Sequence, residues 1–117
     1  AAARIAAADP RIVNLAGQTR LPEAAAVIAR AALLIGVDTG LTHMGTALAR
    51  PTVAIFGSTC PYQDTGRPTG SVIWLGMPCS PCRRRPTCGG AFTCLRDITP
   101  ERVLAQAQAM LAAERTR

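Results

Sequence analysis

Short apolar runs alternate with longer amphipathic stretches along most of the chain. The runs LLIGVD and TVAIFG are apolar almost throughout, which is typical of strands that are covered on both faces. The stretches between the runs have apolar residues at helical spacing and Pro, Gly or Asp near their ends. The pattern predicts strands at 11–17, 33–38, 52–57 and 71–75, and helices at 1–8, 21–32, 40–49 and 99–114.

Two of the expected helices carry further signals. Leu41, Met44 and Leu48 fall at helical spacing, so we expect them to form the buried stripe of their helix. In the last helix, Thr99 is expected to cap the first turn and Pro100 to occupy the first helical position, which each residue type favours.

Strands that alternate with helices favour an α/β fold, with helices packed on a parallel sheet. A chain of 117 residues allows one small domain at most. The apolar periodicity stops after Leu75, so we divide the chain into a core at 1–75 and a Cys- and Arg-rich segment with a final helix at 76–117. Because the chain opens inside an Ala-rich, helix-like stretch, we expect it to be a piece of a longer protein.

Charge narrows the possible chemistry. The net charge is +6, and every one of the basic residues is arginine. The absence of lysine excludes a P-loop lysine, a Schiff-base lysine and a lysine general base from this chain. Arginine suits contact with phosphate or carboxylate, although an excess of positive charge is also common on a plain solvated surface. No apolar run approaches the roughly 20 residues that a membrane span needs.

A polar group of residues interrupts the apolar pattern where the second expected strand meets a helix. Asp38, Thr39 and Gly40 stand at the carboxyl end of that strand, where parallel sheets bind their ligands, and His43 follows one turn later. The first amides of a helix lack internal partners and carry the positive end of its dipole. They suit a phosphate or diphosphate, whereas Asp38 would repel an anion and suits neutral hydroxyl groups, such as those of a sugar.

Simpler roles are open for the same residues. Asp38 or Thr39 fits a helix cap, which is a frequent use of both residue types. His43 fits a structural histidine as well as a ligand contact. Gly40 fits a residue that only eases the turn from strand to helix.

The cysteines form a second candidate site. Cys79, Cys82, Cys88 and Cys94 lie in one short segment, and the Cys-x-x-Cys spacing at its start is half of a common zinc motif. Structural zinc and reduced, packed thiols are both open, and a disulfide or an iron–sulfur cluster is a further alternative. A zinc ion with four thiolate ligands would be structural, since no coordination position is left for substrate. Cys60 is expected to be a plain thiol.

Four motifs follow one another along the chain: LAGQTRL at 15–21, DTGLTH at 38–43, PTVAIFGST at 51–59 and CSPCRRRPTCGGAFTCLRDITPERV at 79–103. This ordered set resembles the ADP-heptose:lipopolysaccharide heptosyltransferases, glycosyltransferase family 9, and in particular their heptosyltransferase II-like members. The resemblance covers nearly the whole chain from about residue 12. One departure lies in the loop after residue 57, where many members have Pro-Thr-Asp-Pro and this chain has Cys60 in place of the acid.

The resemblance implies a GT-B enzyme with two Rossmann-like lobes, of which this chain would be the last two-thirds of the carboxyl-terminal, donor-binding lobe. The core at 1–75 would lack the first strands of that lobe, and 76–117 would pack on the same lobe. The catalytic base of the family lies in the amino-terminal lobe, so no residue of this chain is expected to be catalytic. The donor-binding residues implied are Gln18 and Thr19 on the adenine side, Thr39, Gly40, Leu41 and His43 at the diphosphate, and Asp38 at the heptose hydroxyls.

The implied reaction is transfer of heptose from ADP-heptose to the lipopolysaccharide inner core, with inversion and without a catalytic cofactor. The implied partners are the nucleotide-sugar donor, the lipid-linked acceptor and the amino-terminal lobe of the same protein, with no nucleic acid. The implied location is cytoplasmic, peripheral at the inner face of the inner membrane.

Two other classes compete with this interpretation. Another nucleotide-using Rossmann-like enzyme is disfavoured because no Gly-x-Gly-x-x-Gly follows any expected strand. A zinc-containing nucleic-acid-binding module would use the cysteines and the arginine run, but the buried parallel strands and the scarcity of aromatic residues argue against it.

Overall fold

The computed structural model describes residues 1–83 and 85–116. Its strands all belong to one sheet, and its helices precede, separate and follow them. In chain order the elements are α1 (Ala2–Ala6), α2 (Leu21–Arg30), β1 (Leu34–Gly36), α3 (Gly40–Ala47), β2 (Thr52–Ile55), β3 (Gly70–Ile73), α4 (Thr93–Arg96) and α5 (Pro100–Arg115).

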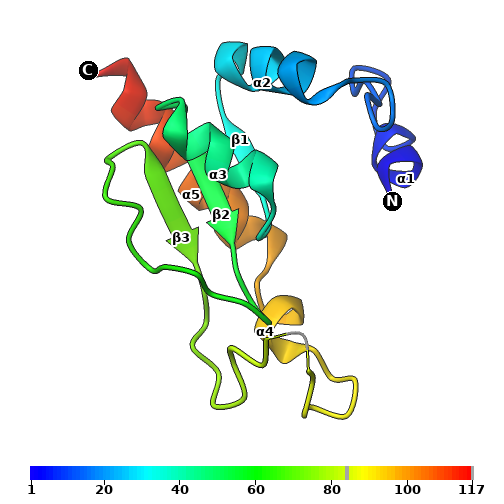
Figure 1. The fold of residues 1–117 in the computed structure, drawn as a ribbon, viewed down its shortest axis with the longest axis vertical. Helices are drawn as coiled ribbons and strands as arrows, with labels where there is room; N and C mark the ends of the chain where they lie inside the picture. Colours follow the sequence, from blue (N-terminus) through cyan, green and yellow to red (C-terminus); the bar gives the residue numbers. More distant parts are fainter. Residues whose placement is uncertain (84, 117) are drawn as a thin grey trace.

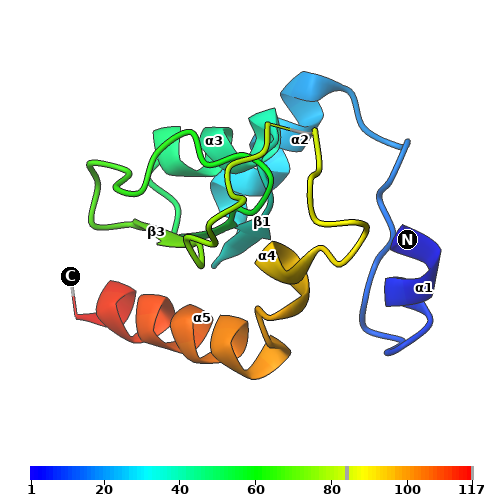
Figure 2. The same cartoon turned by 90° about the horizontal axis from the view of Figure 1, so that it is seen from below.

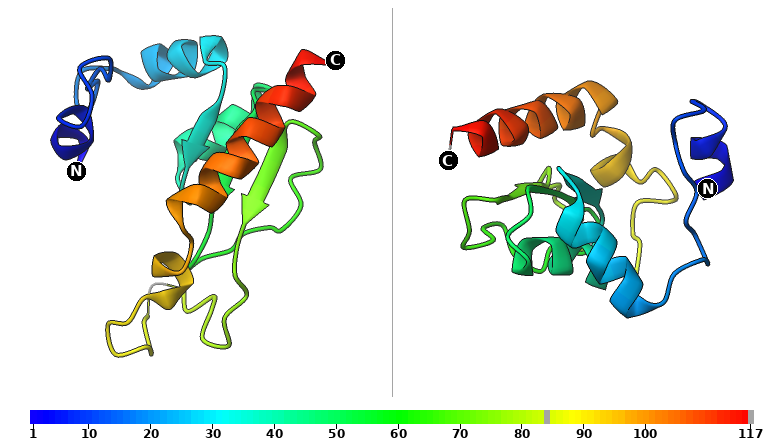
Figure 3. Two further views of the ribbon diagram at one scale, coloured as in Figure 1. Left: turned by 180° about the vertical axis from the view of Figure 1, so that it is seen from behind. Right: turned by 90° about the horizontal axis from the view of Figure 1, so that it is seen from above.

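The three strands form a parallel sheet in the order β1-β2-β3, which confirms the expected α/β fold. Val53 of β2 lies opposite Ile35 of β1 and Ser71 of β3. Helix α5 crosses one face of the sheet, and α3 covers the other with α2 beside it (Figures 2 and 3). In Figure 1 the amino-terminal helix α1 lies away from these layers. No helix among the described residues is long and apolar enough to cross a membrane.

The hydrophobic core lies between the sheet and α5. Val53 and Ile73 from the strands pack against Ala107 and Met110 of the helix, and all four are buried. As expected, α5 begins after Thr99, whose hydroxyl accepts a hydrogen bond from the Arg102 amide at 3.2 Å. The cap sets where the helix starts, and the apolar contacts hold it on the sheet.

On the opposite face, α3 approaches the strands through small residues. Its buried residues are Thr42 and Gly45, so the expected stripe of Leu41, Met44 and Leu48 is wrong. A Cβ atom on Gly45 would lie 2.4 Å from a Leu34 methyl carbon. The close approach leaves no room for large side chains between helix and sheet, so two of the three expected residues are exposed at the helix sides.

The strand expected at 11–17 is also absent from the structure. The segment is irregular, and Val13 is 74% exposed. A strand needs a partner for its backbone groups, and within the described chain this segment pairs with no other strand. The outer edge of β1 is likewise unpaired there, and Ile35 is 47% exposed.

The Cys- and Arg-rich segment connects β3 to α5. Its only regular element among the described residues is the short helix α4, which the sequence pattern did not predict. Phe92, directly before α4, has a φ of 49°, and Gly89 and Gly90 also have positive φ. The segment therefore turns sharply on itself before the final helix begins.

Candidate functional site

The candidate site lies where β1 and β2 end side by side. The chain leaves β1 through Asp38 and enters α3, and it leaves β2 through Phe56 into a loop that runs to Tyr62. Because the strands are parallel, their carboxyl ends meet at one edge of the sheet. A cavity of about 220 Å³ opens at this edge, lined by Val37, Asp38, Ile55, Gly57, Ser58, Thr59 and Leu95.

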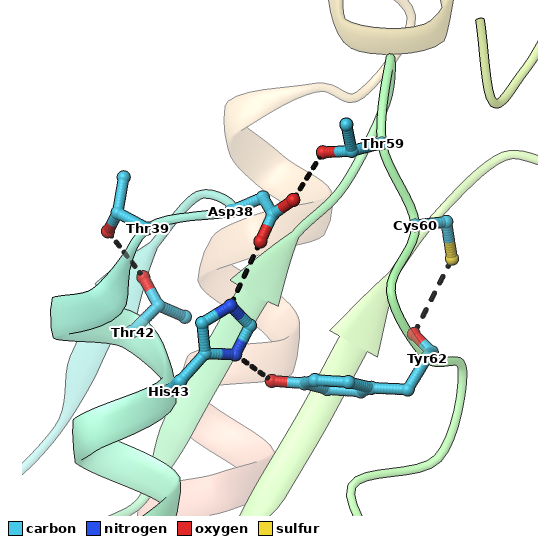
Figure 4. Close-up of polar contacts among 7 residues, drawn as sticks. All are labelled: Asp38, Thr39, Thr42, His43, Thr59, Cys60 and Tyr62. Atoms are coloured by element: carbon cyan, nitrogen blue, oxygen red, sulfur yellow. Dashed lines mark hydrogen bonds and ion pairs between the residues drawn. The ribbon is translucent and has the colours of Figure 1, made fainter. Parts of the chain in front are cut away.

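Asp38 is held from two directions (Figure 4). The hydroxyl of Thr59 donates to Asp38 Oδ2 at 2.5 Å, and His43 Nε2 lies 2.9 Å from Asp38 Oδ1. Thr59 comes from the loop after β2, whereas His43 comes from α3. The two contacts fix the carboxylate at the rim of the cavity between the strand ends.

The imidazole of His43 is also held on its other side. Its Nδ1 atom lies 2.7 Å from the hydroxyl oxygen of Tyr62. The Tyr62 ring packs edge-on against Phe56, with centroids 5.3 Å apart, and against His43 at 5.4 Å. Phe56 is 1% exposed. The rings of Phe56, Tyr62 and His43 therefore form a small aromatic cluster. This packing restrains the Tyr62 hydroxyl and the His43 ring nitrogens.

Burial keeps two groups of this loop in their neutral forms. It raises the pKa of Tyr62, the negative charge of Asp38 raises that pKa further, and the Thr46 hydroxyl lowers it by less. Burial also raises the pKa of the Cys60 thiol, a backbone hydrogen bond with Tyr62 lowers that pKa by less, and the negative charge of Asp38 raises it further. The Cys60 sulfur lies 3.5 Å from that carbonyl. Tyr62 therefore keeps its phenolic proton at neutral pH.

The start of α3 is open to an anion. Thr39 is the N-cap residue, but within the described residues its side chain makes no capping hydrogen bond. Its hydroxyl lies 3.4 Å from that of Thr42 instead. Apart from its chain neighbours and the nearby backbone of its own helix, a Cβ atom on Gly40 would meet no described atom within 4 Å. The side-chain position of Gly40 in the first turn is therefore open, and the simple side-chain cap considered for Thr39 is not what the structure contains.

Gln18 and Thr19 lie apart from this arrangement. Thr19 lines a mostly apolar cavity of about 340 Å³ together with Leu41 from the first turn of α3, and Asp38 lines a different cavity. The side-chain amide of Gln18 donates to the Asn14 carbonyl at 3.2 Å. The structure thus brings Thr19 to Leu41, and it turns the Gln18 amide back to its own segment.

The cysteine segment does not form the metal site that was one of the open alternatives. Cys79, Cys82, Cys88 and Cys94 line one cavity of about 290 Å³, and all are free thiols. Among residues 1–83 and 85–116, no group of three or more Cys, His, Asp or Glu side chains is arranged to hold a metal ion. The prediction of structural zinc is therefore not supported, because the thiols surround a cavity without converging on one point.

The environments of these thiols differ. Backbone amide groups, chiefly that of Phe92, lower the pKa of Cys88. Burial raises the pKa of Cys94, and the charges of the neighbouring cysteines raise it further. The sharp turn at Gly89 and Gly90 brings the amides to the Cys88 sulfur, so the backbone supplies the hydrogen bonds that this thiol receives.

The same segment supports the loop that follows β2 through other groups. The amide of Arg83 donates to the Ser58 carbonyl at 2.7 Å, and the Ser80 hydroxyl donates to the Gly57 carbonyl. Ser80 in turn accepts a hydrogen bond from the Trp74 indole at 3.0 Å. Residues 57 and 58 are thereby fixed directly before Thr59, which contacts Asp38.

Sequence analysis missed Thr59 and Tyr62 as members of the site. They lie 21 and 19 residues from their partners Asp38 and His43 along the chain. The available signal was the position of Thr59 just after the neighbouring parallel strand, since the rule that places Asp38 at the sheet edge applies to that strand as well.

Comparisons with known proteins agree on one family. The model of glycosyltransferase family 9 (heptosyltransferase) matches residues 1–91. Lipopolysaccharide heptosyltransferase 2 of Salmonella typhimurium is 36% identical over 102 residues, which cover 86% of this chain and 29% of the relative. Lipopolysaccharide heptosyltransferase 1 of Pseudomonas aeruginosa is 37% identical over 128 residues, which cover 95% of this chain and 34% of the relative.

A solved structure supports the same assignment. The ADP-heptose lps heptosyltransferase II of E. coli superposes with a TM-score of 0.69 at 36% identity, covering 87% of this chain and 28% of that structure. The chain thus spans about a third of the length of the relatives it matches. With the family model matched over most of its length, the chain belongs to glycosyltransferase family 9, the heptosyltransferases.

Proposed function

We propose that this chain is the nucleotide-sugar-binding part of an enzyme that transfers heptose from ADP-heptose to the inner core of lipopolysaccharide, with inversion at the anomeric carbon. The observation that carries the proposal is the pairing of two features at one sheet edge. Asp38 presents a fixed carboxylate at a cavity, and α3 begins immediately beside it with an uncapped first turn. A carboxylate suits sugar hydroxyls, and a helix start suits the diphosphate.

The proposed mechanism divides the work between groups. The bond from the heptose anomeric carbon to the diphosphate oxygen breaks as an acceptor hydroxyl attacks from the opposite face. Negative charge then develops on ADP, and the amides of the first turn of α3, beside Thr39 and Gly40, stabilise it without reorganising. Asp38 orients the heptose through its hydroxyls. We assign the base that takes the acceptor proton to a part of the longer protein outside this chain.

The proposal extends to the donor's other end and to the acceptor. We place Gln18 and Thr19 toward the adenine and Leu41 at the diphosphate. We place His43 beside the diphosphate, with its ring nitrogens on Asp38 and Tyr62. We also place the enzyme in the cytoplasm, peripherally at the inner face of the inner membrane, where an arginine-rich surface suits a phosphorylated, lipid-linked acceptor.

A titration of the longer protein that contains this chain tests the proposal. ADP-heptose and ADP should bind, a single-stranded oligonucleotide should not, and heptose should be transferred to a core acceptor that lacks it. Binding of the oligonucleotide without binding of ADP-heptose would overturn the assignment. A matched titration with other nucleotide sugars separates the ADP-heptose proposal from a different donor.

A further inference from the structure

A continuous line of side chains joins the two loops at the sheet edge. It runs from Thr59 through Asp38 and His43 to Tyr62, with donor–acceptor distances of 2.5, 2.9 and 2.7 Å. Figure 4 shows that Asp38 and His43 lie in the middle of the line, with Thr59 and Tyr62 at its ends. We call these four residues the relay.

Hydrogen-bond chemistry sets the direction of the relay. A carboxylate only accepts, so both the Thr59 hydroxyl and His43 Nε2 donate to Asp38. A neutral imidazole that carries its proton on Nε2 has an acceptor at Nδ1. The Tyr62 hydroxyl, which burial and the Asp38 charge keep protonated, donates to that atom. Asp38 therefore fixes the tautomer of His43 that is protonated on Nε2, and the Tyr62 hydroxyl donates to the Nδ1 atom that this tautomer leaves as an acceptor.

The relay also leaves the His43 ring nitrogens fully occupied. Nε2 contacts Asp38 and Nδ1 contacts Tyr62, so neither is directed at a donor diphosphate. The ring itself is confined by Phe56, with a centroid distance of 6.4 Å, and by Tyr62. In this geometry, the effect of His43 on the donor passes through the orientation of Asp38.

From this geometry we propose that Tyr62 and Thr59 are positioning residues for sugar transfer, which hold Asp38 in the orientation that receives the heptose hydroxyls. The proposal rests on the function proposed above for Asp38. Neither residue needs to contact the donor itself. The loop that carries them is braced by the Cys60 contact with the Tyr62 carbonyl and by the Arg83 amide on Ser58.

Paired variants in the longer protein test the proposal. Tyr62→Phe keeps the packed ring and removes the hydroxyl, and it should lower kcat for heptose transfer about tenfold. Thr59→Val should lower kcat about tenfold or more, because its hydrogen bond is to a charged group, whereas Thr59→Ser should restore it. The Kd for ADP should be unchanged in all three. Thr116→Val, at the far end of α5, is the control and should have wild-type kinetics.

A double-mutant comparison separates positioning from a general structural effect. If Tyr62 acts through Asp38, then Tyr62→Phe should have almost no additional effect in the Asp38→Asn background. The same fold-loss in both backgrounds would overturn the proposal. An equal loss in Thr59→Val and Thr59→Ser would overturn the role of the Thr59 hydroxyl.

Nitrogen NMR of His43 gives a readout that does not depend on transfer. With labelled histidine, and with His43→Gln to assign the signal, the wild-type protein should show a protonated Nε2 and an accepting Nδ1. Tyr62→Phe should shift the Nδ1 signal, and an unchanged signal would refute the relay. If the relay signals appear but no heptose is transferred, the proposed function fails while the hydrogen-bonded relay stands.

Discussion

Two regions of this chain concentrate reactive side chains, and they are organised differently. At the sheet edge, Asp38 and His43 are each held by partners from separate elements at distances below 3 Å. In the cysteine segment, four thiols line one cavity and remain free. The first region inherits its geometry from two parallel strands, whereas the second depends on a loop turned by residues with positive φ. The spacing of reactive residues in the sequence thus predicts a site more reliably when strands and helices position those residues than when an irregular loop does.

The cysteine segment nevertheless supports the sheet edge that carries Asp38 and His43. Its contributions are the Ser80 hydroxyl on Gly57 and the Arg83 amide on Ser58, both from positions between cysteines in the sequence. The thiols themselves are not the atoms that make these two contacts. The segment therefore supports the loop that follows β2 through hydrogen bonds that a search for metal-ligand spacing does not reveal.

The largest expected effect is on stability, and it should differ between the chain's two phenylalanines. Phe56 packs against the His43 and Tyr62 rings of the relay and is 1% exposed, so Phe56→Ala should lower the free energy of unfolding by about 3–5 kcal/mol. Phe92 lies in the cysteine segment and is 46% exposed, so Phe92→Ala should cost far less. Denaturant unfolding of the longer protein measures both variants. Equal losses would contradict the contrast in packing between the regions.

Substitution of two glycines near the site should change different properties, stability in one case and ADP binding in the other. A Cβ atom at Gly36 would lie 2.1 Å from the Thr42 hydroxyl oxygen, so Gly36→Ala should destabilise the protein by about 1–3 kcal/mol. Gly40→Ala has open space and should leave unfolding unchanged, but its methyl group should weaken ADP binding by standing before the first turn of α3. Unfolding curves and ADP titrations separate the two. An unchanged ADP affinity in Gly40→Ala would contradict an anion site there.

The two threonine N-caps offer a matched pair. Thr39 makes no capping bond from its side chain within the described residues, and its hydroxyl has only a long contact of 3.4 Å with that of Thr42. Thr39→Val should therefore cost less stability than loss of a cap, and it should weaken ADP-heptose binding by about 1–2 kcal/mol. Thr99 does cap its helix, so Thr99→Val should lower stability by about 1 kcal/mol and preserve binding. If Thr39→Val lowered the free energy of unfolding but left the calorimetric affinity for ADP-heptose unchanged, Thr39 would have only a structural role.

The smallest effects concern thiol reactivity, which should leave stability untouched. The lowered pKa of Cys88 gives it more thiolate at pH 7, so it should react first with iodoacetamide. Burial raises the pKa of both Cys60 and Cys94, so these should react last. Mass spectrometry of a time course checks the order. If Cys79, Cys82, Cys88 and Cys94 were all unreactive until a chelator is added, the interpretation as a metal site would be restored.

Much of the sheet could be predicted from the sequence. Three of the four expected strands formed, because continuous apolar runs such as 52–57 leave few alternatives to a buried strand. The strand at 11–17 did not form, since strand formation depends on a partner that its own sequence does not encode. The buried face of α3 was also mispredicted. It follows the close helix–sheet approach at Gly45 and not the spacing of large residues.

The site was predictable only in part. Asp38 and Thr39 could be placed because a strand end and a helix start are adjacent in sequence. Thr59 and Tyr62 could not, since their contacts depend on how β1 and β2 pair and on the path of a loop without regular structure. The same limit explains why four suitably spaced cysteines surround a cavity without forming a metal site.

The most direct measurement compares heptose transfer with ADP binding in a single variant, Asp38→Asn, of the longer protein. Asparagine keeps the shape of the side chain but removes the charge that sugar hydroxyls would recognise. If Asp38 binds the heptose and the start of α3 binds the diphosphate, kcat/KM for transfer should fall about tenfold or more while the Kd for ADP is unchanged. Unchanged transfer, or an equal loss of transfer and ADP binding, would contradict this division of the donor between the two features.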